Sequence, residues 1–431
     1  MSFIGRKFLH ASDIHLGFPL GALADSAQLN ADARTELIAL MQKSFENLIS
    51  LAVEEQVLFV VLAGDIYDNL DRQEALQGLI RRGLEILNEA GIPVFMVHGN
   101  HDPLTKNLKW RRPLPPNVHT FQPDEPHEYT VVSGPDGEVR VAGVSFGASA
   151  VTQNLASRFS SLPAEHSRWR VAVLHTSLGG NSAHETYAPC SVDDLRAAPV
   201  GYWALGHIHL RNDNNPLGPG RWWAYPGNLQ GRSFKPSECH PKGALLVEIT
   251  RDGFGQPEFR ELDTVRFLNV SVPVDEAESV DDSISLVADA ITHAKAENSG
   301  VRLVVRVELT GRTSLAADLS RKINLGDNGF LANLLDSYSD DLADTVVAAI
   351  VSSVRPEHDL QMLRQGDSLI ATALARLDSL TDAEIVEIAG GLVGRGVADR
   401  FPGDEQTGKQ MRDLVEDALV ESILEGQGTG Q

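Results

Sequence analysis

Short apolar runs that end in aspartate, asparagine or histidine constrain this chain more than any other feature of its sequence. Five such runs lie between residues 8 and 250, and each has the length of a buried strand. They begin at Phe8, Val57, Pro93, Val171 and Tyr202. A helix-like stretch, Arg72 to Ala90, separates the second run from the third and ends at Gly91. Strands and helices in this order predict an α/β domain made of layers.

A polar motif follows each of the five runs. The motifs are Asp13-x-His15, Gly64-Asp65-Ile66-Tyr67-Asp68, Gly99-Asn100-His101-Asp102, Leu174-His175-Thr176 and Gly206-His207-Ile208-His209. Residues two apart in an extended segment point the same way, so Asp13 with His15, and His207 with His209, can each contribute two ligands to one metal cluster. The glycines that stand before Asp65, Asn100 and His207 fit tight turns from strand to loop.

The types of ligand indicate a centre with two metal ions. Three carboxylate or amide groups and four imidazoles suit Mn²⁺, Fe²⁺ or Zn²⁺, and they are too many for one tetrahedral zinc. Two ions about 3.5–4 Å apart that share a carboxylate would generate hydroxide near neutral pH and hold a phosphoryl group for in-line attack. One such motif alone is more often a turn or a buried structural histidine. Five in order, each at a strand end, predict a phosphoesterase.

These motifs resemble those of the calcineurin-like metallophosphoesterase superfamily, and in particular its SbcD-type and YhaO-type DNA-repair exonucleases. The resemblance covers residues 8 to about 250. Three further segments match YhaO-type proteins more specifically than the metal motifs do: Tyr187 to Ser191, Tyr202 to Gly206 and Tyr225 to Arg232. The resemblance implies a layered β-sandwich flanked by helices, followed by a small α/β capping domain and a helical C-terminal tail.

The resemblance also implies a role for each residue of the motifs. One ion would be held by Asp13, His15, Asp65 and His209. The other would be held by Asp65, Asn100, His175 and His207, with Asp65 bridging the two ions. His101 would stabilise or protonate the leaving oxygen, and Asp68 would orient its ring and keep it protonated. The role of Asp102 stays open, with a cap on the following loop as the simplest interpretation.

The length of the chain predicts more than one domain, because single cores rarely grow beyond about 250–300 residues. We expect a metallophosphoesterase (nuclease) domain at residues 1–262, a capping domain at 263–355 and a helical segment at 356–431. Within the capping domain, strands at 265–274, 301–309 and 345–354 and a helix at 280–294 form a small α/β unit. In the last segment, Met411, Leu414, Ala418 and Ile423 form an apolar stripe that packs on its own domain or docks a partner.

Basic residues near the motifs are candidates for substrate contacts. Five residues form a basic loop with one aromatic ring directly after the third motif: Lys106, Lys109, Trp110, Arg111 and Arg112. The cations would contact phosphates and an unpaired base would stack on Trp110; alternatively, the loop is solvated and the tryptophan packs on the domain. Arg232, with Lys235 and Lys242, forms a second and weaker basic group.

The charge distribution leaves room for a phosphate-binding site. The net charge is −22, but residues 251–431 carry 16 Lys and Arg against 33 Asp and Glu, so most of the excess acid lies beyond the motifs. No run of 18 apolar residues is present, so we expect no membrane association. Cys190 and Cys239 form no C-x-x-C pair and the N-terminus does not resemble a signal peptide, which predicts a cytoplasmic protein.

Two other motif matches are rejected. Gly143-Val-Ser145-Phe-Gly147 fits the nucleophile elbow of α/β hydrolases, but no helix clearly follows it. The segment from Gly403 to Lys409 fits most of a P-loop, yet Gln410 stands where Ser or Thr would reach Mg²⁺. We therefore expect neither a serine hydrolase site nor an ATP site.

Together these features predict a two-metal-dependent DNA exonuclease that acts in DNA repair or processing, with Mn²⁺ as the expected ion. The resemblance implies DNA as the substrate, an SMC-like ATPase as a partner and a homodimer as the usual assembly, although no residue pattern here shows the dimer. One alternative is a small-molecule phosphomonoesterase or nucleotide phosphodiesterase with the same metal centre. Another is a binding subunit that depends on its ATPase partner.

Overall fold

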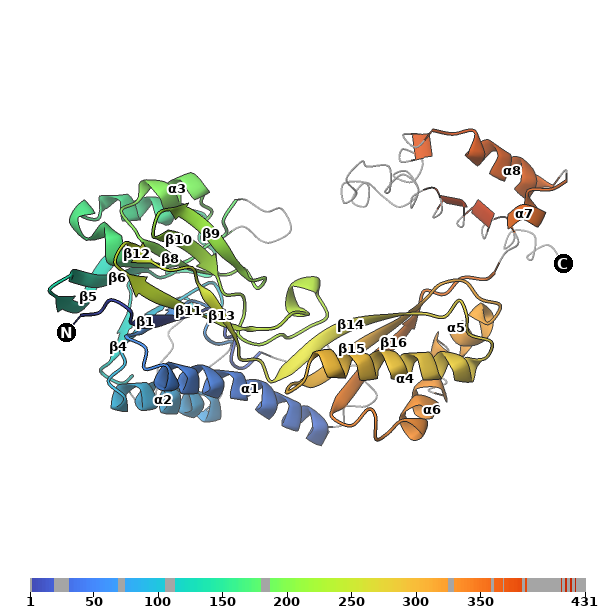
Figure 1. Cartoon of the computed structure of the whole chain (residues 1–431), viewed down its shortest axis with the longest axis horizontal. Coiled ribbons are helices and arrows are strands. Elements are labelled where there is room, and N and C mark those ends of the chain that lie inside the picture. The colour runs from blue at the N-terminus through green and yellow to red at the C-terminus, as the bar shows by residue number, and fades with distance from the viewer. Residues whose placement is uncertain are drawn as a thin grey trace. The chain divides into compact units, whose positions relative to one another are not determined.

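The structure, a computed structural model, describes most of the first 366 residues and short parts of the remainder. The described residues are 2–18, 31–68, 74–104, 113–179, 187–324, 329–357, 360–366, 368–381, 384–385, 412, 415–416, 419–420 and 423. The chain divides into two compact units, which are drawn in Figure 1. The first contains residues 1–311 and 318–354, and the second contains residues 312–317 and 355–431.

The first of two large sheets in the first unit is built around four parallel strands. Its order is β12-β11-β1-β2-β3-β4, and β13 also pairs with β11. The strands are β1 (Lys7–Ala11), β2 (Val60–Ala63), β3 (Val94–Val97), β4 (Val118–Thr120), β11 (Gly243–Thr250), β12 (Gly253–Phe254) and β13 (Glu258–Glu261). Strands β1 to β4 are parallel, whereas β11 runs antiparallel to β1. The first three predicted strands are therefore neighbours in one sheet.

The second large sheet has a parallel centre and antiparallel edges. Its order is β5-β6-β7-β8-β10-β9. The strands are β5 (His127–Gly134), β6 (Gly137–Val144), β7 (Arg170–His175), β8 (Tyr202–Gly206), β9 (Asn212–Gly218) and β10 (Arg221–Tyr225). The predicted strands at Val171 and Tyr202 are β7 and β8, which pair in parallel. The five motifs thus follow three strands of one sheet and two of the other.

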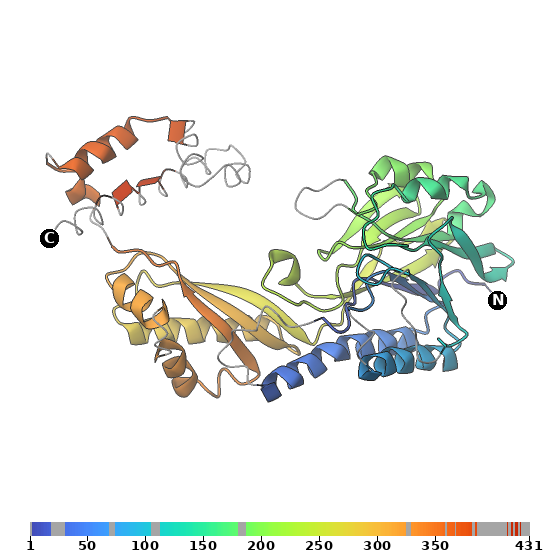
Figure 2. The same cartoon turned by 180° about the vertical axis from the view of Figure 1, so that it is seen from behind.

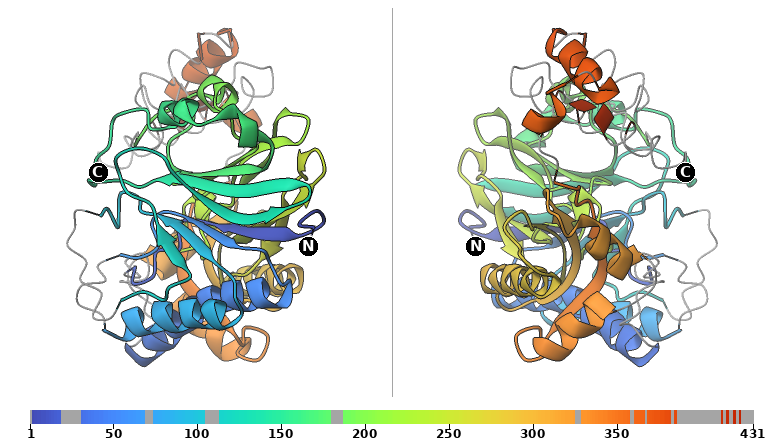
Figure 3. Two further views of the ribbon diagram at one scale, coloured as in Figure 1. Left: turned by 90° about the vertical axis from the view of Figure 1, so that its left-hand side faces the viewer. Right: turned by 90° about the vertical axis from the view of Figure 1, so that its right-hand side faces the viewer.

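Helices cover the outer faces of the two sheets, so this part of the chain has four layers (Figure 3). The helices are α1 (Ala31–Glu54), α2 (Glu74–Glu89) and α3 (Val192–Ala197). Phe45 of α1 and Leu84 of α2 pack against the first sheet, and Leu195 of α3 packs against the second. Aromatic side chains such as Phe8 and Tyr202 fill the space between the sheets. The predicted fold class, a layered β-sandwich flanked by helices, is confirmed.

A third, smaller sheet follows the sandwich in the same unit. Its parallel strands, in the order β14-β15-β16, are β14 (Val265–Pro273), β15 (Arg302–Thr310) and β16 (Thr345–Ser352). The helices between them are α4 (Val280–Glu297), α5 (Ala316–Asn324) and α6 (Gly329–Ser337). Helix α4 runs along the sheet and buries Ile284, Val287 and Ile291 (Figure 1, Figure 2). The strands and α4 were expected; α5 and α6 were not.

The second unit is helical in its described part. Its helices are α7 (Leu360–Leu363) and α8 (Leu369–Asp378). Leu374 of α8 packs with Val420, and Ile423 is partly buried against the same cluster. The other residues of the predicted apolar stripe lie outside the described residues: Met411, Leu414 and Ala418. None of the described helices has the length and apolar character that crossing a membrane requires.

Candidate metal centre

The carboxyl ends of β1, β2, β3, β7 and β8 place all seven predicted ligands in one site. Within each sheet these strands are parallel, so their ends face the same edge of the sandwich. Three groups of side chains there have ligand atoms within 4.8 Å of one another: Asp13 with His15 and His209, His15 with Asp65 and His101, and Asp13 with Asp65 and His175. Asn100 and His207 contact members of these groups. The tertiary structure therefore unites residues from five separate segments.

Four of the seven ligand candidates have a left-handed backbone conformation. The φ angles are 50° at Asp13, 47° at His15, 50° at Asp65 and 101° at His207. This conformation costs a residue with a β-carbon about 1 kcal/mol or more, although aspartate and histidine adopt it more often than most residues. Such strain persists where the surrounding structure enforces it, and it clusters at functional sites. The backbone here is shaped to aim side chains rather than to be stable.

The three motif glycines serve two different purposes. Gly64 has a φ of 89°, as the predicted turn requires. Gly99 and Gly206 are not in the left-handed region, so their need for glycine has another cause. A β-carbon on Gly99 would clash with Asp65 Oδ1, and one on Gly206 would clash with the Ala63 carbonyl oxygen. These two glycines are needed because the strand ends pack too closely for any side chain.

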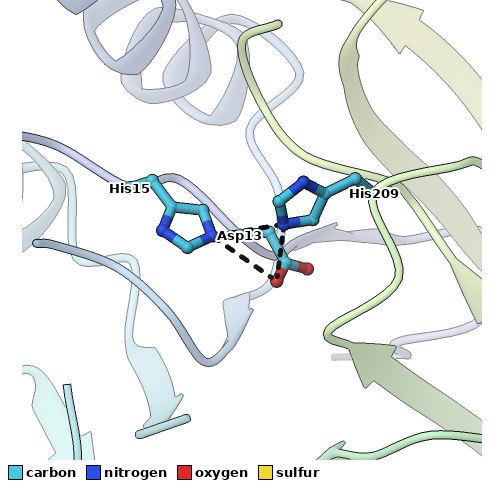
Figure 4. A group of neighbouring side chains, drawn as sticks. All are labelled: Asp13, His15 and His209. Carbon is cyan, nitrogen blue, oxygen red and sulfur yellow. Dashed lines mark hydrogen bonds and ion pairs between the residues drawn. The ribbon is translucent and has the colours of Figure 1, made fainter. Parts of the chain in front are cut away.

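The first ligand group consists of Asp13, His15 and His209 (Figure 4). The Nε2 atoms of the two histidines are 3.3 Å apart. Asp13 Oδ1 lies 4.0 Å from His15 Nε2 and 3.8 Å from His209 Nε2. Each Nδ1 atom faces a carboxylate, Asp68 for His15 at 3.0 Å and Glu238 for His209 at 2.7 Å. We infer that the ring protons sit on Nδ1, so two Nε2 lone pairs converge beside a carboxylate. A cation is the group that stabilises this arrangement.

The second ligand group surrounds His175. Its Nδ1 lies 3.0 Å from the Ala63 carbonyl oxygen, and its Nε2 faces Asn100 Oδ1 at 3.0 Å and Asp65 Oδ2 at 3.4 Å. Burial lowers the pKa of His175, but the Asp65 carboxylate outweighs burial and the pKa rises to about 9. Because Nδ1 and Nε2 both face oxygen acceptors, the ring needs either a second proton or a metal ion at Nε2. The His207 ring lies beside that of His175, with 5.2 Å between the ring centroids.

One oxygen of Asp65 faces both ligand groups. Asp65 Oδ2 is 3.7 Å from His15 Nε2 and 3.4 Å from His175 Nε2. The other oxygen accepts a hydrogen bond from the backbone N–H of His101 at 2.9 Å. Burial favours the neutral acid, but the neighbouring histidines lower the pKa of Asp65 below its ordinary value. One oxygen of Asp65 therefore lies between the histidines of the two ligand groups.

His101 and Asp68 form a hydrogen-bonded pair at the edge of the site. His101 Nδ1 lies 2.5 Å from Asp68 Oδ1, and the imidazole is 42% exposed. The hydrogen bond to Asp68 raises the pKa of His101 above its ordinary value. A protonated, half-exposed imidazole can deliver a proton to a leaving oxygen. Asp68 also holds His15 through its second oxygen, so it connects the acid candidate to the ligand group.

Comparison with known proteins identifies the family. The calcineurin-like phosphoesterase family matches residues 6–211, and the middle domain of metallophosphoesterase YhaO matches residues 267–355. The chain is 32% identical over 308 residues to the uncharacterized metallophosphoesterase YhaO of Bacillus subtilis, which covers 70% of this chain and 71% of that protein. The chain belongs to the calcineurin-like metallophosphoesterases, in the YhaO branch.

More distant relatives of this metallophosphoesterase carry the names of DNA-processing proteins. DNA double-strand break repair protein Mre11 of Sulfurisphaera tokodaii is 27% identical over 277 residues, 62% of this chain and 63% of that protein. The chain thus matches less than two thirds of that relative. A subunit of the nuclease SbcCD from Staphylococcus epidermidis is 23% identical over 297 residues, 61% of this chain and 71% of that protein. The predicted enzyme class, a metal-dependent phosphoesterase, is confirmed.

Asp102 of the metallophosphoesterase fastens two of the site loops together. Its Oδ1 accepts a hydrogen bond from the Gly99 N–H at 2.7 Å, and its Oδ2 accepts one from the Ile66 N–H at 2.9 Å. The carboxylate is buried, and backbone N–H groups satisfy both of its oxygens. Asp102 therefore joins the loop after β2 to the loop after β3, a contact between segments that no local pattern reveals.

Glu238 is a site residue that the sequence reasoning missed. It ends the short 3₁₀ turn Pro236–Glu238, is 4% exposed, and accepts hydrogen bonds from Asn228 Nδ2 and the Arg232 N–H besides its bond to His209. Burial opposes its ionisation, but His209, Arg232 and Lys242 lower the pKa of Glu238 to about 2. Its position six residues after Arg232 follows no known spacing rule, so only the fold identifies it.

The basic residues divide into three cases. Arg232 lies at the site, 3.6 Å from Asp68 Oδ2 and 3.9 Å from Glu238 Oε1. Lys242 does not face substrate, because it is 3% exposed and its Nζ donates to the carbonyl oxygens of His209 and Ser237. Its inclusion in a substrate-binding group was wrong. The loop residues lie outside the described residues: Lys106, Lys109, Trp110, Arg111 and Arg112.

The ligand groups open onto a cavity of about 410 Å³, which we call the metal cavity. Its lining includes Asp65, Asn100, His101, His207 and His209 from the motifs, together with Phe18, Tyr187, Arg232 and Lys235. The serine of the rejected hydrolase motif does not face this cavity, because Ser145 is buried and its hydroxyl donates to the Phe121 carbonyl oxygen. The P-loop-like segment lies outside the described residues.

Proposed function

We propose that this metallophosphoesterase is a two-metal-dependent nuclease that hydrolyses phosphodiester bonds of DNA, as an exonuclease in repair or processing. The observation that carries the proposal is the His101–Asp68 pair at the mouth of the ligand groups. A sugar oxygen is a poor leaving group, so cleavage of DNA benefits from a positioned acid. The names of the Mre11 and SbcCD relatives also support a nuclease that acts on DNA.

The ligand geometry fits two divalent ions, for which we propose Mn²⁺. Asp13, His15, Asp65 and His209 would hold one ion. Asp65, Asn100, His175 and His207 would hold the other. When bound, the ions would polarise the phosphoryl group and lower the pKa of the attacking water. The chain itself supplies the rest: Arg232 binds a phosphate oxygen, Asp68 fixes the ring of His101, and His101 donates a proton to the leaving oxygen.

The first test is digestion of end-labelled linear DNA by the purified protein with Mn²⁺. Asp65→Ala is run beside the wild type, and para-nitrophenyl phosphate is offered to both proteins. Progressive shortening of DNA that the variant has lost supports the nuclease. Hydrolysis of the monoester with intact DNA would instead indicate the small-molecule phosphatase. If both substrates stay intact, the partner-dependent binding subunit becomes the better explanation.

A second test isolates the acid. His101→Gln should lower the cleavage of DNA by about 10²- to 10⁴-fold, the usual contribution of a general acid. Hydrolysis of bis-para-nitrophenyl phosphate should change little, because nitrophenolate leaves without protonation. Equal losses on both substrates would contradict the assigned role of His101 and leave it as a binding residue.

We further propose that the protein works with an SMC-like ATPase, forms a homodimer and acts in the cytoplasm. One relative is by name a subunit of the nuclease SbcCD, which supports a multi-subunit assembly. In this proposal residues 1–262 form the nuclease domain, residues 263–355 form a capping domain that orients DNA, and residues 356–431 form a helical segment. Co-purification with the ATPase and light scattering of the pure protein test the two assemblies separately.

A further inference from the structure

A second cavity, of about 270 Å³, adjoins the metal cavity. It lies between the segment after β1 and helix α1, and we call it the side cavity. Leu16, Phe18, Ile38 and Met41 give it apolar walls, and Gln42 adds an amide. None of the metal-ligand roles proposed above uses these five side chains. The side cavity is thus a separate, largely apolar space next to a charged centre.

Phe18 and Arg232 line both cavities. The Arg232 guanidinium lies 4.1 Å from the centroid of the Phe18 ring, and its Nη2 is 3.5 Å from His209 Nδ1. His15, a member of the first ligand group, also lines the side cavity. A group bound in the side cavity is therefore directly adjacent to a phosphate held by Arg232 and the metal ligands.

The chemistry of the walls fits a nucleobase. A base needs flat apolar or aromatic surfaces for its faces and a hydrogen-bonding group for its edge. Phe18, Ile38 and Met41 supply the surfaces, and the Gln42 amide supplies donor and acceptor atoms. Gln230 also lines the cavity, but its amide is already bonded to the Thr264 N–H and the Val265 carbonyl oxygen. Gln42 is therefore the better candidate for reading a base edge.

The negative net charge of the chain makes a contribution of base stacking to DNA binding useful. The net charge is −22, and the cations among the described residues that line the metal cavity are Arg232 and Lys235. Stacking of one base typically changes nucleic-acid affinity by about tenfold or more and does not depend on net charge.

We propose that the side cavity binds the base of the nucleotide next to the scissile phosphate in single-stranded or frayed DNA. This inference rests on the proposed nuclease function. It assigns Phe18 as the stacking surface, Gln42 as the edge contact and Arg232 as the group that joins base recognition to phosphate binding. The pocket favours an unpaired base, because a base edge in a duplex is already occupied by its partner.

The test fills the side cavity. Gln42→Trp places a bulky ring in it, and Ala39→Trp is the matched control, since Ala39 is exposed on the same helix and neither change alters the charge. Two single-stranded oligonucleotides are compared, one normal and one whose three terminal nucleotides are abasic. Gln42→Trp should cut the normal oligonucleotide about tenfold more slowly than wild type and the abasic one at the wild-type rate. The ratio of dissociation constants for the two oligonucleotides, measured without added metal, should fall toward one in this variant.

The outcomes separate the inference from the function on which it rests. If wild type and Gln42→Trp cut and bind both oligonucleotides alike, the base pocket is wrong and the nuclease stands. If the wild type cuts neither oligonucleotide with Mn²⁺, the proposed function fails and the pocket falls with it. If Gln42→Trp also loses cutting of the abasic oligonucleotide, the tryptophan damages the metal centre, and the inference is overturned. A comparison of Mn²⁺ binding by Gln42→Trp and Ala39→Trp would show such damage independently.

Discussion

Single residues outside the proposed ligand set hold the rings of the ligand candidates in this metallophosphoesterase in place. Asp68 contacts His15 at Nδ1, Glu238 contacts His209 at Nδ1, and the Ala63 carbonyl oxygen contacts His175 at Nδ1. In each case the opposite nitrogen, Nε2, is left for the centre of the site. Such partners fix ring orientation and increase ligand basicity. The strength of metal binding should therefore depend on residues that never touch a metal.

Glu238→Gln should weaken Mn²⁺ binding about tenfold or more, because the amide keeps the shape of Glu238 but removes the charge that supports His209. Titration calorimetry with Mn²⁺ measures the change directly. Glu248→Gln, an exposed position on β11, serves as the control and should bind like wild type. Equal affinities for Glu238→Gln and wild type would show that the carboxylate has only a structural role.

We expect His10 to make the stability of the folded protein sensitive to acid. It is buried on β1, with Nδ1 3.1 Å from the Tyr202 hydroxyl and Nε2 3.2 Å from the Leu205 carbonyl oxygen. Burial lowers the pKa of His10 to about 3, whereas in the unfolded chain it is near 6.5. Between these two pH values, His10 binds a proton in the unfolded state but not in the folded state. The contribution of His10 to stability is therefore complete above pH 6.5 and is lost as the pH falls toward 3, by up to about 1.4 kcal/mol per pH unit.

His10→Gln should remove this component, since the amide can make both hydrogen bonds without titrating. The free energy of unfolding, measured with urea between about pH 4 and pH 7, should depend less steeply on pH in the variant than in wild type. His293→Gln, at an exposed position on α4, is the matched control. A variant slope equal to that of wild type would mean that His10 does not set the acid sensitivity.

At the scale of secondary-structure elements, two glycines of α2 show how the neighbour decides the effect of one methyl group. A β-carbon on Gly78 would meet only the end of the flexible Arg82 side chain, at 3.3 Å. A β-carbon on Gly83 would lie 2.7 Å from Phe45 Cε1 of α1. The first glycine is a helix-interior residue with open space, and the second is the point where α1 and α2 pack together.

Gly78→Ala should raise the free energy of unfolding by about 0.5–1 kcal/mol, because alanine loses less backbone entropy in a helix than glycine does. Gly83→Ala should instead lower it by about 1–3 kcal/mol, because the added methyl group overpacks the contact with Phe45. Urea denaturation of both variants checks the pair. Stabilisation by both changes would contradict the close packing of the two helices.

At the scale of the whole molecule, the metal centre connects the two sheets of the sandwich. Asp13 and Asp65 follow strands of the first sheet, whereas His175 and His209 belong to or follow strands of the second. An unfolded chain cannot present these ligands together, so ions that bind here stabilise the folded state. Metal binding and global stability should therefore change together.

Mn²⁺ at about a hundred times its Kd should raise the Tm by about 5 °C or more, and EDTA should reverse the shift. Asp65→Asn should lose most of the shift, because one oxygen of Asp65 faces both ligand groups. Differential scanning calorimetry with and without Mn²⁺ makes the comparison. An undiminished shift in the variant would place the stabilising ion elsewhere in the protein.

Local pattern was sufficient for the five strands that precede the motifs and for the candidate ligands. An apolar run with a polar residue directly beyond it predicts both a buried strand and a functional strand end, so Asp13, Asp65 and His175 could be selected without a structure. The same reasoning could not find Glu238, it misjudged Lys242, and it did not reveal why Gly99 and Gly206 must lack a side chain. Those residues owe their roles to atoms far away in sequence, such as the Ala63 carbonyl oxygen beside Gly206.

The order of apolar and polar residues along this chain therefore determined the layered α/β fold and the metal chemistry, because alternation and ligand type are local properties. The tertiary structure alone decided which ring nitrogen of each histidine faces the centre, which single oxygen of Asp65 faces both ligand groups, and that Phe18 and Arg232 line both cavities. Distances between side chains from different strands depend on how two sheets pack, and that packing is a property of the whole folded chain.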